Sequence, residues 1–143
     1  MTAALVLALF FTVVLLAITA YFLMGSLPLL ILKHDTPMDS SFVRGFFNTY
    51  YRAAMFAAGA AALSYALAGR PVFAAGAAAL ALSATVLRRL IIPKMDSLRT
   101  QMQFNETSAI PGFRRMHVTA ILLNLVQLVV TVGSLVAISI QMK

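Results

Sequence analysis

The sequence predicts an all-α integral membrane protein, in which a single domain over residues 1–143 folds as a bundle of four transmembrane helices. Two observations predict this fold class. Hydrophobic residues make up 62% of the chain and charged residues only 10%, compared with about 25% charged residues in soluble domains. Uncharged stretches long enough to cross the hydrocarbon of a bilayer alternate with short polar segments. The chain has room for one bundle and no separate catalytic domain.

The first helix is expected over residues 3–32, because Met1 to Leu32 contains no charged residue. A cleaved signal peptide would have a basic start and a shorter apolar core, so the stretch predicts a transmembrane helix instead. Gly25 and Pro28 predict a kink or break near its far end, since proline removes a backbone donor and clashes with the preceding turn.

The second and third helices are expected over residues 41–67 and 71–92 as an antiparallel hairpin. Gly69-Arg70-Pro71 between them is typical of a tight turn. The facing stretches 57–62 and 74–79 consist of Ala and Gly alone. Small residues let helix backbones approach closely in lipid, so the sequence predicts a tightly packed pair.

The longest segment outside the membrane is expected over residues 94–110. Pro93 is predicted to kink or end the third helix just before it. Met95 and Leu98 fall at helical spacing within the segment, which favours an interfacial helix there. The fourth helix is then expected over residues 111–142.

The distribution of Lys and Arg predicts the orientation. Nine of these residues belong to the polar loops 33–41 and 94–110 and their flanks, and two to the opposite side. The nine are Lys33, Arg44, Arg52, Arg88, Arg89, Lys94, Arg99, Arg114 and Arg115, and the two are Arg70 and Lys143. In membrane proteins, the cytoplasmic loops carry an excess of Lys and Arg. Both polar loops are therefore predicted to be cytoplasmic and both termini extracytoplasmic, with the protein in a bacterial inner membrane. The same charges predict contact with anionic membrane lipids. Nucleic acid is not an expected partner, because no basic domain lies outside the membrane.

Polar residues interrupt the fourth helix, which has no Asp, Glu, Lys or Arg from Met116 to Met142. His117 and Asn124 lie seven residues apart, on nearly one helical face, and Gln127 follows one turn later. Polar side chains at this depth are costly and usually face a bundle interior or a wet cavity. We therefore expect a polar interior near the cytoplasmic boundary, with His117 as the candidate catalytic residue and Asn124 as a candidate ligand-binding residue. The competing interpretation of His117 is a structural histidine.

Four further candidates for ligand binding come from the hairpin. Asn48, Tyr51 and Arg52 share one helical face through their spacing. Arg52 and Arg88 are equally far in sequence from Arg70, so the hairpin places both cations at one depth. The competing interpretations are arginines that snorkel to phosphate head groups and a tyrosine belt at the membrane interface.

Metal chemistry has little support in the sequence. The chain has no cysteine, which excludes a thiolate metal site and an iron–sulfur cluster. The two histidines and several methionines of the cytoplasmic side leave haem or copper as an option for an otherwise unknown cofactor. No spacing such as His-x-x-His supports that option, and the sequence predicts no metal ligands.

The fourth helix carries a resemblance. Phe113-x-Arg115-x-His117, followed by Asn124-Leu125, resembles the signature of a four-helix membrane family that includes bacterial proteins with the domain of unknown function 4149 and the eukaryotic transmembrane protein 205. Segments 93–99 and Phe46-Phe47-x-x-Tyr50 are similar too. This resemblance implies no established activity. A histidine at the start of the fourth helix also resembles the pattern of the anthrone oxygenase-like family. That resemblance implies oxygenation of a lipophilic polyketide without a metal.

Two functions are compatible with these residues. The first is a membrane protein with a cytoplasm-facing polar, basic pocket that binds a small amphipathic or anionic molecule, with oxygenase-like oxidoreductase chemistry as a further option. The alternative is a non-catalytic subunit or assembly factor that packs against a larger membrane protein or against copies of itself. A ligand-sized cavity at His117 would favour the first function. A filled core with an apolar, lipid-facing groove would favour the second.

Overall fold

The computed structural model describes residues 2–34, 36–104 and 107–142. These residues form four long α-helices and one short 3-10 helix, and no strand occurs among them, so the prediction of an all-α, four-helix chain is confirmed. The elements are α1 (Ala3–Ser26), η1 (Pro28–Ile31), α2 (Pro37–Leu67), α3 (Pro71–Gln103) and α4 (Ala109–Gln141). Lys143 and positions 35, 105 and 106 of the predicted polar loops lie outside the described residues.

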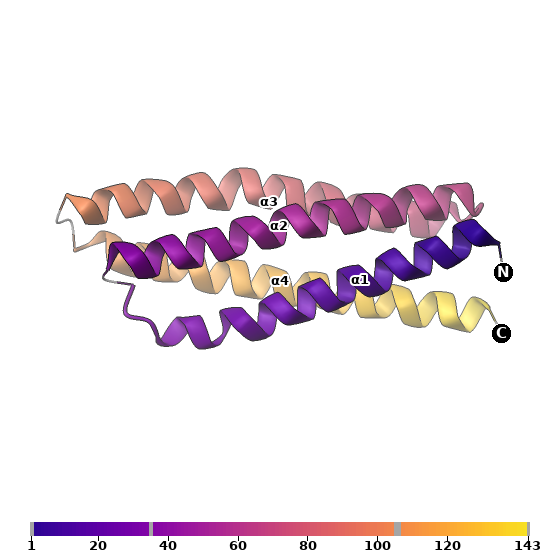
Figure 1. Ribbon diagram of the computed structural model, residues 1–143, viewed down its shortest axis with the longest axis horizontal. Helices are drawn as coiled ribbons and strands as arrows, with labels where there is room; N and C mark the ends of the chain where they lie inside the picture. The colour runs from indigo at the N-terminus through magenta and orange to yellow at the C-terminus, as the bar shows by residue number, and fades with distance from the viewer. Residues whose placement is uncertain (1, 35, 105–106, 143) are drawn as a thin grey trace.

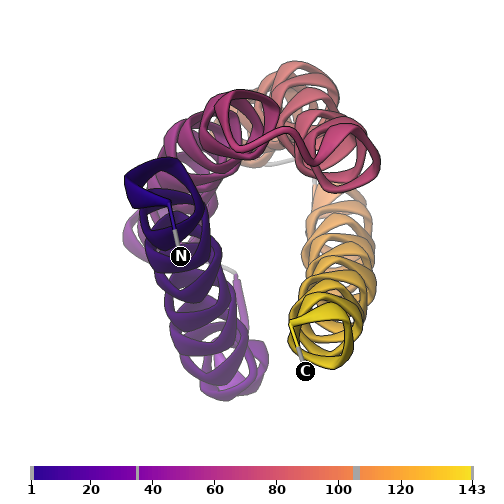
Figure 2. The ribbon, with the colours of Figure 1, turned by 90° about the vertical axis from the view of Figure 1, so that its right-hand side faces the viewer.

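The helices follow one another around the bundle in chain order. Seen end-on they form an arc from α1 to α4 (Figure 2), and contacts between α1 and α4 close it. Both chain termini and the α2–α3 turn lie at one end, the terminal end (Figure 1). The α1–α2 and α3–α4 connections lie at the other end, the loop end.

In the part of the chain that the structure describes, three segments are long and apolar enough to cross a membrane: α1 with η1, α3, and α4. Large apolar side chains are exposed on the outside of the bundle, among them Phe10, Phe56, Leu82 and Val129. Thr, Tyr, Asn, Gln and His side chains are among the buried residues. This distribution matches a surface that faces lipid and an interior that holds the polar groups.

The predicted break in the first helix is confirmed. α1 ends at Ser26, and Pro28 begins the short 3-10 helix that follows. Gly25 allows a close approach of α1 to α2, because a Cβ added there would lie 2.7 Å from Cζ of Phe46. The missing side chain therefore leaves room for the Phe46 ring of α2 against α1 at the loop end.

The predicted end of the third helix near Pro93 is wrong, because α3 continues through Pro93 to Gln103. A proline inside a helix forfeits one hydrogen bond and strains one turn. Ile91, Met95 and Leu98 are buried on both sides of it, and their packing on neighbouring helices holds the extension. Much of the segment 94–110 is therefore α-helix.

Two other predicted boundaries also shift toward longer helices. α2 begins at Pro37 rather than residue 41, since the Thr36 hydroxyl caps the helix by accepting from the Asp39 amide at 3.1 Å. α4 begins at Ala109, two residues before the predicted start. Arg44 of α2 donates twice to Asp96 of α3, at 2.8 and 2.9 Å, and ties the extended ends together.

The predicted pairing of the second and third helices is confirmed, although its glycines play a different part than expected. α2 and α3 share the most extensive helix interface of the bundle. Ala57, Ala58 and Ala61 of α2 are buried, as is Ala77 of α3. A Cβ added at Gly59 or Gly76 meets nothing within 4 Å, so the glycines face away from the contact.

Candidate functional site

The bundle interior contains a column of buried polar side chains from the loop end toward the terminal end, which we call the polar seam. Every member is at most 8% exposed. The members are His34, His117, Tyr51, Asn124, Tyr50, Gln127, Thr19, Thr131, Thr12 and Tyr65.

Heptad spacing on two antiparallel helices builds the seam. Thr12 and Thr19 are seven residues apart on α1, and His117, Asn124 and Thr131 repeat the same interval on α4. Seven residues bring a helix back to nearly the same face, so each helix presents its polar side chains along one line. The two lines meet where α1 and α4 pack, and tyrosines of α2 cover them.

Two histidines form the loop-end part of the seam. Nε2 of His34 and Nδ1 of His117 are 3.0 Å apart, and both side chains are fully buried. One ring donates its N–H and the other accepts, so at least one imidazole is neutral. His34 follows η1 with φ of +60°, a left-handed conformation that turns the chain inward and that side chains other than glycine adopt rarely.

Aromatic rings enclose the histidine pair. The Phe47 ring centroid lies 5.4 Å from that of His117, edge-on, and the Phe113 centroid lies 5.7 Å from that of His34. Both phenylalanines are at most 1% exposed. The histidine pair is therefore packed into the core, with no open face toward the loop end.

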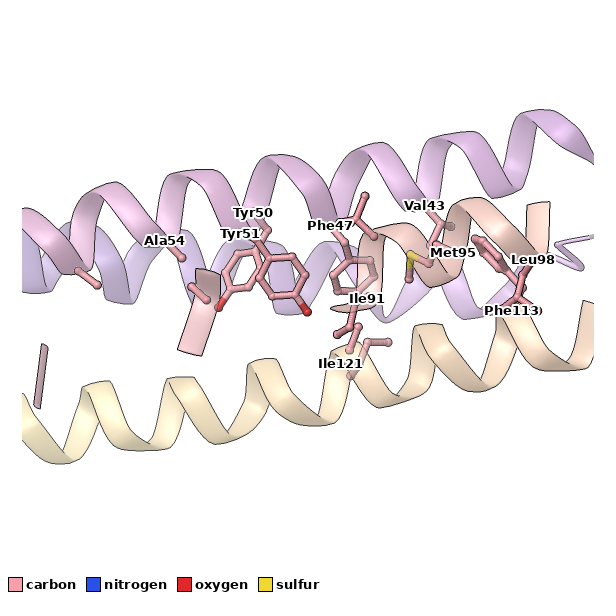
Figure 3. Close-up of a cluster of buried hydrophobic side chains, with 14 of the residues drawn as sticks. Val43, Phe47, Tyr50, Tyr51, Ala54, Ile91, Met95, Leu98, Phe113 and Ile121 are labelled. Carbon is pink, nitrogen blue, oxygen red and sulfur yellow. The ribbon is translucent and has the colours of Figure 1, made fainter. Parts of the chain in front are cut away.

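Hydrogen bonds join three helices near the middle of the seam. The Tyr50 hydroxyl of α2 donates to Oε1 of Gln127, and Nε2 of Gln127 donates to Oγ of Ser83 on α3 at 3.1 Å. Figure 3 shows Tyr50 and Tyr51 on α2 with both hydroxyls directed toward α4. A cavity of about 10 Å³, enough for about one water molecule, is lined by Thr19, Tyr50 and Gln127. Nearer the terminal end, the Thr12 and Tyr65 hydroxyls are 3.1 Å apart.

Three buried polar atoms of the seam have no hydrogen-bond partner among the described residues. They are Oη of Tyr51 and Nδ2 and Oδ1 of Asn124. A buried polar atom without a partner costs about 1–3 kcal/mol. Tyr51 follows Tyr50, and Asn124 lies one turn before Gln127, so both flank the Tyr50–Gln127 hydrogen bond. These atoms have the capacity for hydrogen bonds, both as donors and as acceptors, that no described residue fills.

An apolar groove lies beside this layer, between α3 and α4. Its volume is about 360 Å³. Gly76, Leu80 and Leu87 line it on the α3 side and Leu123 and Val130 on the α4 side. Ser83 and Gln127 are the polar residues of the lining, so the groove reaches the hydrogen-bonded layer.

The predicted cations lie at the edge of the bundle and not in the seam. Nε of Arg88 donates to Oδ1 of Asn48 at 2.9 Å, and both side chains are partly buried. Arg52 is exposed. Of the six predicted site residues, the structure places His117, Asn124 and Tyr51 in the seam and pairs Asn48 with Arg88 beside it.

The described residues contain no cluster of three or more His, Cys, Asp or Glu side chains that could hold a metal ion. The two histidines contact each other and offer two nitrogen ligands at most. The option of haem or copper stays a prediction.

The predictions from the sequence did not include the pairing of His34 with His117 or the part played by Thr12, Thr19, Tyr50 and Tyr65. The heptad interval between the two threonines of α1 was a readable signal. The histidine contact joins residues 83 positions apart, and no local pattern indicates it.

No protein-family model, curated protein or solved structure matches this chain. The resemblances to the two four-helix families stay predictions.

Proposed function

We propose that the chain is an integral membrane protein that crosses a bacterial inner membrane four times, with its loop end in the cytoplasm. Three helices have the length and hydropathy of membrane spans. α2 packs on both α1 and α3 and runs beside them (Figures 1 and 2), so a bilayer crossed by these two helices is crossed by α2 as well. The excess of Lys and Arg at the loop end supports a cytoplasmic location for that end.

The proposed function is to bind a small amphipathic molecule whose polar group lies in the polar seam. The observation that carries this proposal is the set of unpartnered buried atoms on Tyr51 and Asn124. A hydroxyl and a primary amide can together donate three hydrogen bonds and accept several. A ligand carbonyl would accept from the donors of both residues, and a ligand hydroxyl could also donate to Oδ1 of Asn124, so either group would lower the cost of their burial.

A neutral polar group fits this site better than an anion. No Lys or Arg belongs to the polar seam, Arg88 is bound to Asn48, and Arg52 is exposed. An anion buried without a paired cation would cost several kcal/mol. Of the two ligand classes that the sequence leaves open, we therefore propose the neutral amphipathic one. The oxygenase-like chemistry stays a prediction.

Two observations favour the alternative of a non-catalytic subunit or an assembly factor. The core beside Tyr50 and Gln127 has space for about one water molecule, and an apolar groove lies between α3 and α4, which is the pattern expected of this function. The histidine pair is fully buried between phenylalanines, which is what a structural role of His117 requires. In that function the seam would hold the helices together, and the apolar outer surface would pack against a membrane partner.

A binding experiment separates these functions. The chain has no tryptophan, so Val86→Trp places a single reporter beside the groove, next to Leu87 of its lining, without filling it. Leu63→Trp places a control on the exposed face of α2. A chainless, methyl-substituted benzoquinone is a neutral carbonyl probe that quenches tryptophan. We expect saturable quenching of the Val86→Trp reporter only. Asn124→Leu should lower the affinity about tenfold, which corresponds to the loss of one or two hydrogen bonds.

Thr119→Val is the matched control. Thr119 is an exposed residue of α4 outside the polar seam, and its hydroxyl donates to the Arg115 carbonyl at 2.9 Å, so the substitution should leave the affinity unchanged. Quenching that rises linearly and equally for both reporters would show that the probe only partitions into the membrane phase, and the binding function would be rejected in favour of the alternative.

A further inference from the structure

We infer that the α3–α4 groove is a lateral entrance and the binding site for the hydrocarbon chain of the ligand; this inference rests on the proposed function. The ligand is then a membrane-soluble lipid with a neutral carbonyl or hydroxyl head and a hydrocarbon chain. The ligand would then enter from the bilayer, between the helices, and not from the cytoplasm.

The closed loop end supports a lateral route. His34, His117, Phe47 and Phe113 are each at most 1% exposed, and their rings contact one another. Figure 3 shows Phe47, Met95 and Phe113 filling the core on this side of the tyrosines. A molecule arriving from the loop end would have to displace this packing.

The groove, in contrast, already reaches the polar layer. Gln127 belongs to its lining and also accepts the hydrogen bond of Tyr50. The Gln127 amide nitrogen uses one N–H for Ser83 and carries a second. Asn124, whose amide has no partner among the described residues, lies one turn from Gln127 toward the loop end.

The direction of the groove matches the orientation of a lipid in the leaflet at the loop end. Arg88, which donates to Asn48, marks the loop-end limit of the uncharged part of α3. Ser83 lies about 7 Å from Arg88 along the helix, toward the terminal end. Gly76 lies roughly 10 Å farther toward the terminal end. A ligand with its head at Ser83 and Gln127 and its chain along Gly76 therefore has its polar end nearer the membrane surface.

The size and the lining of the groove suit one hydrocarbon chain. Its volume of about 360 Å³ is within the range of small-molecule sites, about 300–1,000 Å³. Apart from Ser83 and Gln127, its walls are Leu, Val, Ala and Gly residues. This polar floor favours an occupant with a polar head over the apolar surface of a partner helix, because the Gln127 amide can donate to an acceptor of the head group.

The test compares two probes in the Val86→Trp reporter reconstituted in lipid nanodiscs: the chainless benzoquinone and the same ring with a decyl chain. Gly76→Leu fills the groove, and its new side chain has space because a Cβ there meets nothing within 4 Å. We expect Gly76→Leu to weaken binding of the decyl probe about tenfold or more. The chainless probe should change by less than about twofold, as expected for a substitution away from the bound group.

Gly133→Leu is the matched control, since Gly133 is an exposed glycine of α4 outside the groove lining with equally open space. It should alter neither probe. If both probes saturate and Gly76→Leu changes neither, the groove inference is overturned while the head-group site stands. If neither probe saturates in any variant, the proposed function itself fails. If Gly76→Leu leaves both probes unchanged but shifts the oligomeric state in light scattering, the groove is a contact between copies of the chain.

Discussion

At the residue scale, the histidine pair is the feature whose interpretation the structure changes most. The sequence indicates His117 as a single polar residue on a membrane helix, either catalytic or structural. In the structure, Nε2 of His34 lies 3.0 Å from Nδ1 of His117. The two residues therefore have to be considered as one unit, and a substitution at either position affects both.

We expect His34→Ala and His117→Ala each to destabilise the protein by about 1–3 kcal/mol, because each leaves a buried ring nitrogen without its partner. The double variant should cost clearly less than the sum of the two, since no orphaned imidazole remains. Thermal unfolding of the four proteins in detergent measures this coupling. Strictly additive losses would show that the 3.0 Å contact contributes nothing to stability.

At the element scale, the small residues of α2 divide into two kinds that the sequence does not distinguish. Ala58 is 1% exposed, in the interface with neighbouring helices, whereas a Cβ at Gly59 meets nothing within 4 Å. Both residues belong to one Ala/Gly run, and adjacent positions on a helix point about 100° apart.

Ala58→Leu should destabilise the bundle by about 1–3 kcal/mol through overpacking. Gly59→Leu, one residue away, should be neutral or slightly stabilising, because leucine has the better helix propensity and meets open space. Thermal stability of the two variants in one detergent measures the difference. Equal destabilisation by both would mean that the α2–α3 contact is rotated relative to the structure described.

The extension of α3 beyond Pro93 is a second lesson at this scale. Local sequence rules predict a break at an internal proline, and they omit the packing that opposes it. Burial of Ile91, Met95 and Leu98 against the rest of the core offsets the loss of one backbone hydrogen bond. Tertiary packing therefore decides the length of this helix.

At the scale of the whole molecule, the orientation in the membrane remains the main prediction. The chain has no cysteine, so single cysteines can be placed without a background. In the α1–α2 region, Ser40 is only 1% exposed, so a cysteine there would not be accessible to a reagent, whereas Met38 is 78% exposed. Ser108 and Thr2 are also exposed. These three positions sample both ends of the bundle.

In intact cells, a membrane-impermeant thiol reagent should label Thr2→Cys and spare Met38→Cys and Ser108→Cys. Lysis should make all three reactive, which controls for accessibility. The physical reason is the excess of positive charge at the loop end, which favours its retention in the cytoplasm. Labelling of Met38→Cys and Ser108→Cys in intact cells would reverse the orientation.

The sequence by itself determined the class of fold and part of the site. Hydropathy and charge spacing are local properties, and they were enough to predict four helices, the break near Pro28 and the α2–α3 hairpin. The seven-residue interval of His117 and Asn124 placed both on one inward face, and both are buried.

Only the tertiary structure decided which residues meet across that interior. The His34–His117 contact, the Tyr50–Gln127–Ser83 hydrogen bonds and the groove beside them join residues from different helices. Their geometry depends on how the helices rotate and slide against one another, which is set by the packing of all side chains at once. A pattern along the chain fixes the face of a helix, but the partner of that face is a property of the whole fold.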